Sequence, residues 1–184
     1  MEHMFQKMNI FSKSSLKILC FLGRQYREEY HTREIVRKID ISLGSASRSL
    51  NELEKEKLVI KDEKGKLSMY KANMENPILR ELKILFTLFE IEELIKDLKL
   101  ISNQIILYGS CATGEDTQDS DIDLFIQSDD SKKVNKSINK HQIHIERTVS
   151  LVVFNDIELR KLKEKDRPFY SRIKKGKLLY EDSV

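Results

Sequence analysis

Two aspartates separated by one residue, Asp121 and Asp123, are the side chains of this 184-residue chain best placed to carry out chemistry. The segment from Asp121 to Ile126 has the alternation of a strand, so both carboxylates should lie on one face. At strand spacing their Cα atoms would be about 6.5–7 Å apart. Carboxylates so placed can hold Mg²⁺ together, and a pair of such ions can stabilise the attacking and leaving oxygens of an in-line displacement.

A glycine and a serine, Gly109 and Ser110, precede the acidic pair, with ten residues between Ser110 and Asp121. The apolar run 105–107 leads into them and predicts a buried strand that ends at a tight turn. Glycine lets the backbone approach a ligand, and amides beside the serine can hold a phosphate where a helix begins. Either motif alone would be an ordinary polar turn. Their combination on two strands favours a site for a nucleoside triphosphate and its metal.

A Gly-Ser turn followed by an Asp-x-Asp pair resembles the signature of the polymerase-beta-type nucleotidyltransferase superfamily, in particular its minimal stand-alone domains. The matching positions are Gly109, Ser110, Asp121 and Asp123. The resemblance implies that the turn holds the triphosphate and that the acidic pair holds Mg²⁺ while a nucleoside monophosphate is transferred to a hydroxyl group. It continues in two segments that are similar to the family's closing helix and final strand, residues 168–170 and 175–180.

The third acidic position of that family departs from the pattern. By resemblance a further carboxylate is expected on the next strand, where this chain has Ser150. Serine is not a charged ligand and accepts no proton at neutral pH. Glu146 would share the strand face but would lie about 13 Å away, so it is not an obvious substitute. Reduced activity, a base supplied by water or a partner, and nucleotide binding without transfer all stay open.

The substrate and acceptor follow only from the resemblance. It implies Mg²⁺ as the cofactor and ATP, or another nucleoside triphosphate, as the substrate, with AMP as the group transferred. Some minimal transferases of the superfamily modify a companion toxin. The implied acceptor is therefore a protein of that kind or another hydroxyl compound, and the sequence does not fix the base or the acceptor.

The N-terminal part, residues 14–72, follows the order helix, helix, helix, hairpin. Ser14 and Ser15 can cap the first helix, and Thr32 can cap the second. A third helix starts after Ser42, and its apolar residues recur at spacings of three and four, which predicts a buried stripe. That stripe consists of Leu43, Ala46, Leu50 and Leu53.

The opposite face of the third helix presents short polar side chains and one arginine, which would let the helix enter a DNA major groove. Arginine can contact guanine there, and asparagine can contact adenine. Gly65 can supply a positive φ in the hairpin, making a wing with lysines near its tip. The candidate DNA-binding residues are Ser45, Ser47, Arg48, Asn51, Lys55 and Lys64.

This order resembles the winged helix-turn-helix domain of prokaryotic transcription regulators, particularly between Ser45 and Ile60. The resemblance implies DNA binding. Winged helices also serve as docking or dimerisation modules, and Glu52, Glu54 and Glu56 weaken the electrostatic case for DNA.

A long helix is predicted between the two parts, from Ile78 to about Leu100, with Pro77 at its start. Its apolar residues cover more than one stripe, so it needs partners beyond one small domain. It either connects the domains within one chain or packs against the same helix of a second copy in a homodimer. The sequence thus predicts an α+β chain with a winged helix-turn-helix domain, a linker helix, and a nucleotidyltransferase-like α/β domain with a small mixed sheet, at residues 1–76, 77–100 and 101–184.

Composition limits the class of protein. Hydrophobic residues make up 40% of the chain and charged residues 34%, with a net charge of +3. Opposite charges are interspersed, so the balance permits nucleic-acid binding without arguing for it. Cys20 and Cys111 are far apart, which indicates neither a disulfide framework nor a zinc site and favours a reducing cytoplasm. No segment of about 18 residues is free of charge, so neither a membrane span nor a signal peptide is expected.

Three functional hypotheses follow from these patterns. One is a nucleotidyltransferase coupled to a DNA-binding domain. Another is a non-enzymatic winged-helix transcription regulator whose degenerate transferase domain senses a nucleotide. The last is a dimeric interaction module that has lost both activities.

Overall fold

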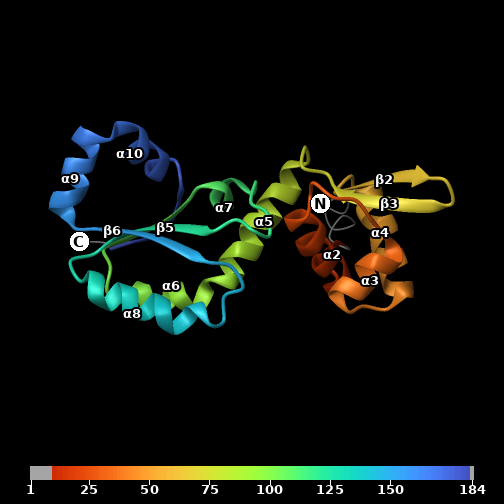
Figure 1. Cartoon of the computed structure of the whole chain (residues 1–184), viewed down its shortest axis with the longest axis horizontal. Helices are drawn as coiled ribbons and strands as arrows, with labels where there is room; N and C mark the ends of the chain where they lie inside the picture. Colours follow the sequence, from red (N-terminus) through yellow and green to blue (C-terminus); the bar gives the residue numbers. More distant parts are fainter. Residues whose placement is uncertain (1–9, 183–184) are drawn as a thin grey trace, which may run out of the picture. The chain divides into compact units, whose positions relative to one another are not determined.

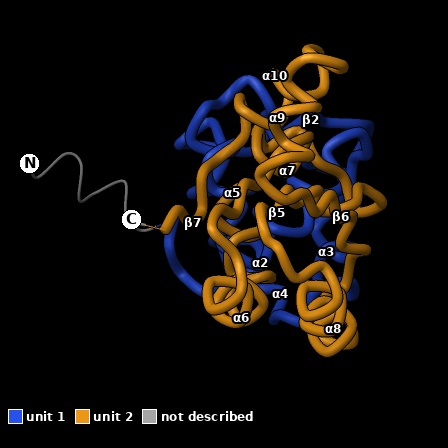
Figure 2. Tube along the Cα trace, turned by 90° about the vertical axis from the view of Figure 1, so that its left-hand side faces the viewer, with its two compact units in different colours: residues 1–83 blue, residues 84–184 orange. Residues whose placement is uncertain are grey.

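The chain forms two compact units in a computed structural model that describes residues 10–182. Unit 1 ends at Lys83 and unit 2 begins at Ile84, as the two colours of Figure 2 show. Both units contain helices and strands (Figure 1), so the α+β class predicted from the sequence is confirmed. Among residues 10–182, no helix has the length and apolar character needed to cross a membrane.

The described part of unit 1 contains three complete α-helices, the start of a fourth, α5, and a three-stranded antiparallel sheet. The complete helices are α2 (Lys13–Arg24), α3 (Thr32–Ile39) and α4 (Leu43–Lys55). The strands are β1 (Tyr30–His31), β2 (Val59–Lys64) and β3 (Leu67–Ala72), paired in the order β1-β3-β2. The hairpin turns at Gly65, which has the expected positive φ of 67°. This succession is that of a winged helix-turn-helix domain, which confirms the predicted fold of the N-terminal part.

Side chains cap the helices of unit 1 at their N-termini. Ser42 precedes α4, as predicted, and caps it. The first two helices begin earlier than predicted, because Ser12 caps α2 and His31 caps α3 in place of Thr32. His31 Nδ1 accepts a hydrogen bond from the Glu34 amide at 3.3 Å, and the Glu34 carboxylate accepts one from the His31 amide at 3.0 Å. This reciprocal capping box is usually built on serine or threonine, so it could not be predicted at a histidine from the sequence.

The core of unit 1 comes from one side of each helix. Ala46, Leu50 and Leu53 are fully buried, as the apolar stripe of α4 predicts. The prediction is wrong for Leu43, which is 49% exposed because it is the first residue of α4 and the core covers the helix only from Ala46 onward. Fully buried apolar residues of the two preceding helices are Ile18, Leu19 and Leu22 of α2 and Ile35 of α3.

Unit 2 is a four-stranded mixed sheet covered by helices. Its strands are β4 (Gln104–Tyr108), β5 (Ile122–Gln127), β6 (Val149–Phe154) and β7 (Lys177–Glu181). They lie in the order β6-β5-β4-β7, with β5 and β6 parallel and the other pairs antiparallel. Its helices are the end of α5 (Pro77–Glu90), α6 (Glu92–Leu98), α7 (Ser110–Thr113), α8 (Ser131–Gln142), α9 (Asp156–Lys165) and α10 (Arg167–Lys174).

Both faces of the central strand β4 are buried. Ile105 and Leu107 belong to an apolar cluster that includes residues of α6 and α8, whereas Ile106 and Tyr108 belong to a second cluster with Ile173 of α10. Figure 1 shows α6 and α8 on one side of β5 and β6, and α9 and α10 on the other. A strand covered on both faces needs apolar residues without alternation, which explains the continuous run that precedes Gly109.

The predicted helix from Ile78 to Leu100 is interrupted. Ile91 separates α5 from α6 and has φ −106° and ψ 7°, which are not helical values. Ile91, Leu94 and Leu98 are all buried in the same cluster as the sheet residues. Packing against the sheet therefore sets the break, and the end of α5 together with α6 forms part of the core of unit 2.

Candidate nucleotide and metal site

The Gly-Ser turn lies where β4 ends. Gly109 has φ 70° and ψ −158°, and α7 begins at Ser110. A Cβ atom on Gly109 would overlap Asp123 Oδ2, so a larger residue is excluded both by the backbone angle and by the carboxylate. The backbone at Gly109 thus comes close to a carboxylate of the acidic pair, and its predicted approach to a ligand stays a prediction.

The acidic pair lies at the start of β5. Asp123 is half-buried and pairs with Tyr108 of β4, while Asp121 is exposed one residue before the strand. Burial raises the pKa of the Asp123 carboxyl above its ordinary value; the charge of Arg172 opposes this shift and that of Asp121 adds to it. A hydrogen bond from Ser150 also lowers the pKa of Asp123. A cation bound here would relieve the cost of keeping Asp123 ionised.

Ser150 stands at the third acidic position of the family pattern, as the sequence predicts. Ser150 pairs directly with Asp123 in the parallel register of β5 and β6. Glu146 is exposed and precedes β6, which begins at Val149, so the strand position predicted for Glu146 is wrong. Within the described part of the chain, no three His, Cys, Asp or Glu side chains are grouped to hold a metal ion. The two carboxylates suit Mg²⁺ held partly by phosphate oxygens, and they do not form a closed protein cage.

A pocket of about 330 Å³ adjoins the Gly-Ser turn and contains two cations that sequence reasoning missed. Arg172 and Lys175 line it together with Gly109, Ser110 and one carboxylate, Glu115. The Arg172 guanidinium lies 5.5 Å from the centre of the Tyr108 ring, which holds it against the end of β4. Anionic phosphates would meet backbone amides on one side of this pocket and positive charge on the other.

A second glycine brings those cations to the turn. A Cβ on Gly176 would lie 2.5 Å from the Leu107 carbonyl oxygen and 2.7 Å from Ile106 Cγ2. Only glycine therefore lets the chain between α10 and β7 pass this close to β4. The three basic residues in the Lys-Lys-Gly-Lys segment at 174–177 were the signal in the sequence that pointed to this wall of the pocket.

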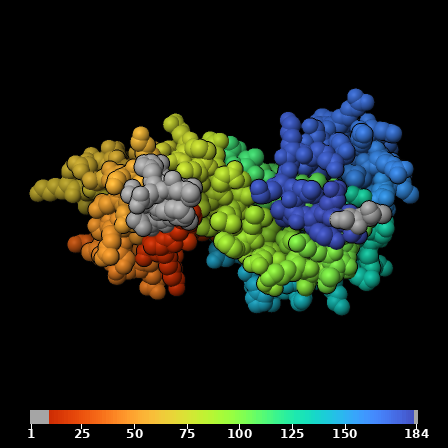
Figure 3. All heavy atoms as spheres, turned by 180° about the vertical axis from the view of Figure 1, so that it is seen from behind, coloured from red at the N-terminus to blue at the C-terminus, as the bar shows by residue number. Residues whose placement is uncertain are grey.

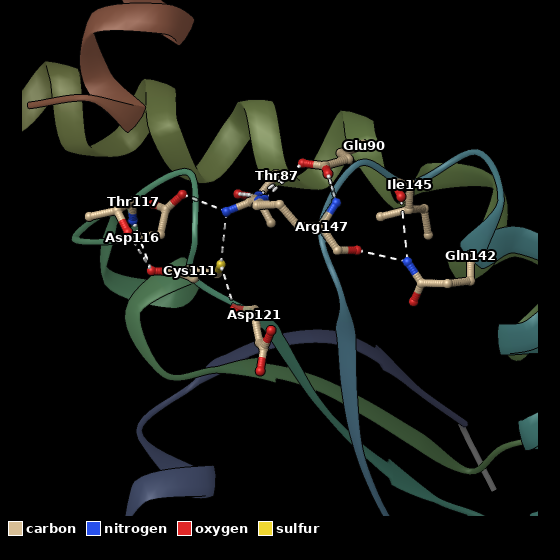
Figure 4. A network of polar contacts seen from close by, with 10 residues as sticks. Thr87, Glu90, Cys111, Asp116, Thr117, Asp121, Gln142, Ile145 and Arg147 are labelled. Carbon is tan, nitrogen blue, oxygen red and sulfur yellow. Dashed lines mark hydrogen bonds and ion pairs between the residues drawn. The ribbon is translucent and has the colours of Figure 1, made fainter.

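A buried arginine braces the loop between the two motifs (Figure 4). Arg147 Nη1 donates to Asp116 Oδ2 at 2.7 Å, and Nη2 donates to Glu90 Oε2 and to Thr87 Oγ1, each at 2.9 Å. The side chains of Arg147, Asp116 and Glu90 are only 2%, 1% and 10% exposed. Arg147 was not among the residues predicted from the sequence, since nothing in its neighbourhood marks a lone arginine as buried.

Two hydrogen bonds connect this arginine to the acidic pair. Arg147 Nη1 donates to the Cys111 sulfur at 3.4 Å, and the Cys111 thiol donates to the Asp121 carbonyl oxygen at 3.4 Å. The Ile122 amide donates to the carbonyl oxygen of Thr148, the residue after Arg147, at 2.8 Å. Burial raises the pKa of the Cys111 thiol to about 11, so at neutral pH it is a protonated structural group and not a nucleophile.

The candidate DNA-binding residues occupy α4 and the wing of unit 1. Ser47, Arg48, Asn51 and Lys55 are exposed, and Arg48 has no acidic side chain within ion-pair distance among residues 10–182. Ser45 is half-buried and shares a hollow of about 400 Å³ with Arg48, Ser12, Ser14, Ser49 and Glu52. Lys64 differs from the rest because it pairs with Glu29 at 2.6 Å, which reduces the positive charge it offers to DNA.

Comparison with known proteins identifies one family. The family model described as Polymerase beta, Nucleotidyltransferase matches residues 89–184. A search of curated proteins finds no match. Solved structures that resemble the chain include HlyU from Vibrio cholerae N16961, with 21% identity over 48% of this chain and 98% of that chain and a TM-score of 0.38.

Two further similar structures are the transcriptional repressor BigR from Xylella fastidiosa and the homodimeric winged helix-turn-helix DNA-binding domain Mb0332 from Mycobacterium bovis. Each is 19% identical over 50% of this chain, with 88% and 82% of the other chain covered and TM-scores of 0.40 and 0.33. At such TM-scores these likenesses carry no argument about partners. The winged-helix assignment of unit 1 rests on its own order of elements.

Proposed function

Because the chain belongs to the Polymerase beta, Nucleotidyltransferase family, we propose that unit 2 transfers a nucleoside monophosphate, AMP from ATP, to an acceptor hydroxyl group and releases pyrophosphate. The observation that supports this most strongly is the closeness of Gly109 to Asp123, whose carboxylate an added Cβ on the glycine would meet. If the Gly-Ser turn binds phosphate, one ligand with a triphosphate and a metal ion would use both the turn and the acidic pair.

In this proposal Gly109 and Ser110 bind the triphosphate through their amides, and Arg172 and Lys175 neutralise its charge from the other wall of the pocket. Asp121 would join Asp123 in holding Mg²⁺. When bound, Mg²⁺ would supply the positive charge that stabilises the leaving pyrophosphate.

The reaction forms a bond between the acceptor oxygen and the α-phosphorus and breaks the bond from that phosphorus to the bridging oxygen of pyrophosphate. The hydroxyl proton must leave to water or to a group of the acceptor, because Ser150 accepts no proton at neutral pH. A protein acceptor such as a companion toxin, which the family resemblance implies, stays a prediction.

The proposal is tested with ATP labelled at the α-phosphate, Mg²⁺ and candidate acceptors, by measuring label transfer and pyrophosphate together. A transferase releases one pyrophosphate for each label transferred. The position of Ser150 beside Asp123 favours a second candidate, a regulator that senses nucleotide without turning it over. That candidate binds ATP saturably with Mg²⁺, releases no pyrophosphate, and changes its DNA affinity when nucleotide binds.

The substitution Ser150→Asp would place a carboxylate at the third acidic position of the site. Ser150→Asp is expected to lower the Mg²⁺ concentration for half-maximal transfer about tenfold, since the new side chain would adjoin Asp123. Without metal the same variant should unfold more easily, because two like charges would face each other on neighbouring strands. Mg²⁺ titrations of transfer and of thermal unfolding measure both effects. Ser150→Asn is the neutral control, and equal results for the two variants would argue against a metal at this position.

We also propose that unit 1 binds DNA through the outer face of α4, with the wing beside it. Ser47, Arg48, Asn51 and Lys55 supply exposed polar and basic groups there, and Ser45 lies at the edge of the same face. Lys64 contributes less because of its pairing with Glu29. Two copies of the chain would then read two half-sites, which is the usual arrangement for helix-turn-helix proteins.

Arg48→Ala is expected to weaken specific DNA binding by about 1–3 kcal/mol, because a bidentate arginine contact to guanine has that value. The measurement is a titration of labelled duplex, after selection of a preferred sequence from a random pool, at several salt concentrations. Arg37→Ala removes an equally exposed arginine from α3 and is the control. A loss of the same size in both variants would show that Arg48 contributes charge alone.

A further inference from the structure

The segment 156–177 concentrates the positive charge of the chain. It contains nine lysines and arginines against four aspartates and glutamates, a net charge of +5, whereas the whole chain has +3. The remaining residues are therefore slightly acidic in sum. Figure 3 shows this segment, in blue, at the surface of unit 2. A segment so charged on an otherwise acidic chain forms a local electrostatic attractor for polyanions.

Some of these basic side chains line a groove. A hollow of about 580 Å³ lies between α9 and α10, with Arg160, Lys163 and Arg167 on its walls beside the half-buried ring of Tyr170 and one carboxylate, Glu164. The three cations are exposed, and no acidic side chain of residues 10–182 lies within ion-pair distance of them. They are therefore available to a ligand.

Three other surface lysines of unit 2 are paired, although Lys132 and Lys136 on α8 are exposed and have no ion pair among the described residues. Lys96, Lys133 and Lys140 each pair with a neighbouring carboxylate, at 2.8, 3.0 and 2.7 Å. Unpaired cations gathered in one hollow cost electrostatic repulsion, which a bound polyanion would relieve.

The helix that lines the groove also contributes to the nucleotide pocket. Arg167, Tyr170 and Ser171 line the groove, and Arg172 and Lys175, which come next along the chain, line the pocket beside Gly109. Basic residues of one short segment, 167–175, thus line parts of both hollows.

We infer that the α9–α10 groove binds a single-stranded nucleic acid, whose phosphates contact Arg160, Lys163 and Arg167 and one of whose bases stacks on Tyr170. Proteins that bind single strands combine a basic groove with an aromatic side chain in this way. An acidic protein would use the cations but has no need for an aromatic ring among them. This surface is distinct from the proposed DNA-binding face of α4, and its test requires neither ATP nor Mg²⁺.

The test measures binding of fluorescein-labelled single-stranded RNA and DNA 12-mers to the full chain by anisotropy. Arg160→Gln, Lys163→Gln and Arg167→Gln together are expected to lower affinity at least tenfold and to reduce the slope of log affinity against log salt by about 2, since each phosphate contact contributes about 0.7. Lys132→Gln, Lys133→Gln and Lys136→Gln on α8 change the net charge equally and should leave affinity within about twofold.

A second variant separates a nucleic acid from other polyanions. Tyr170→Leu should weaken oligonucleotide binding at least fivefold, which is the loss expected for one stacked base, and should not change binding of inorganic polyphosphate or polyglutamate. Equal losses in the two triple variants would overturn the proposal in favour of unspecific charge attraction. Tyr170→Leu affecting no ligand, or polyglutamate binding more tightly than RNA and DNA, would overturn it in favour of an acidic protein.

Discussion

Asp121→Asn combined with Asp123→Asn is expected to reduce nucleotidyl transfer on the order of a thousandfold, because the metal clamp that the pair would form supplies several kcal/mol to the transition state. The substitution keeps the size of each side chain and removes its charge. Stability should not fall. Asp123 is half-buried with a raised pKa, so a neutral side chain relieves both its desolvation and its repulsion by Asp121. Transfer of label from ATP and thermal unfolding, measured on the same preparation, check both expectations.

The matched control is Asp129→Asn with Asp182→Asn, which removes two exposed carboxylates at the opposite end of the sheet and changes the net charge by the same amount. Its transfer rate should stay within about twofold of the original chain, since surface charges away from the site act only through a screened field. Transfer that survives the Asp121 and Asp123 change would rule out these residues as the metal ligands. Loss of activity together with a large loss of stability would point to a structural role for the pair instead.

The parts of the site that could be predicted from the sequence depend only on residues that are close to one another along the chain. The backbone at Gly109 needs a positive φ, and the strands on either side of it are marked by apolar runs. Asp123 lies in β5 and Asp121 one residue before it, so the strand predicted from Asp121 to Ile126 begins one residue later than expected. Each of these features depends on residues within a few positions, and a sequence pattern is enough to show them.

The residues that were missed depend on distant parts of the chain. Arg172 and Lys175 reach the Gly-Ser turn only because the sheet order β6-β5-β4-β7 places the final strand beside β4. Ile91 is followed by apolar residues at helical spacing, so the sequence alone favours a continuous helix there, and only packing against the sheet breaks it. Long-range packing overrides local propensity at both places.

Arg147→Met is expected to lower the free energy of unfolding of unit 2 by about 3–5 kcal/mol, because removing one partner of a buried ion pair leaves a buried charge uncompensated. Arg147 holds Asp116 and Glu90 in a region where all three side chains are at most 10% exposed. Methionine fills much of the same volume, so the expected loss of stability comes mainly from the unpaired carboxylates of Asp116 and Glu90. Amide hydrogen exchange in β5 during a urea titration measures this loss in unit 2 independently of unit 1.

The control is Lys140→Met, because the Lys140–Asp97 and Arg147–Asp116 pairs have the same nitrogen–oxygen distance of 2.7 Å. Lys140 and Asp97 are 68% and 38% exposed, and an exposed pair contributes only about 0–1 kcal/mol. Adding Asp116→Leu to Arg147→Met should recover part of the loss, since the leucine removes one of the unpaired charges. If Lys140→Met and Arg147→Met lower the free energy of unfolding equally, burial does not determine the strength of the Arg147 network. A larger loss at Arg147 with partial recovery would show that this network holds the loop between the Gly-Ser turn and the acidic pair in place.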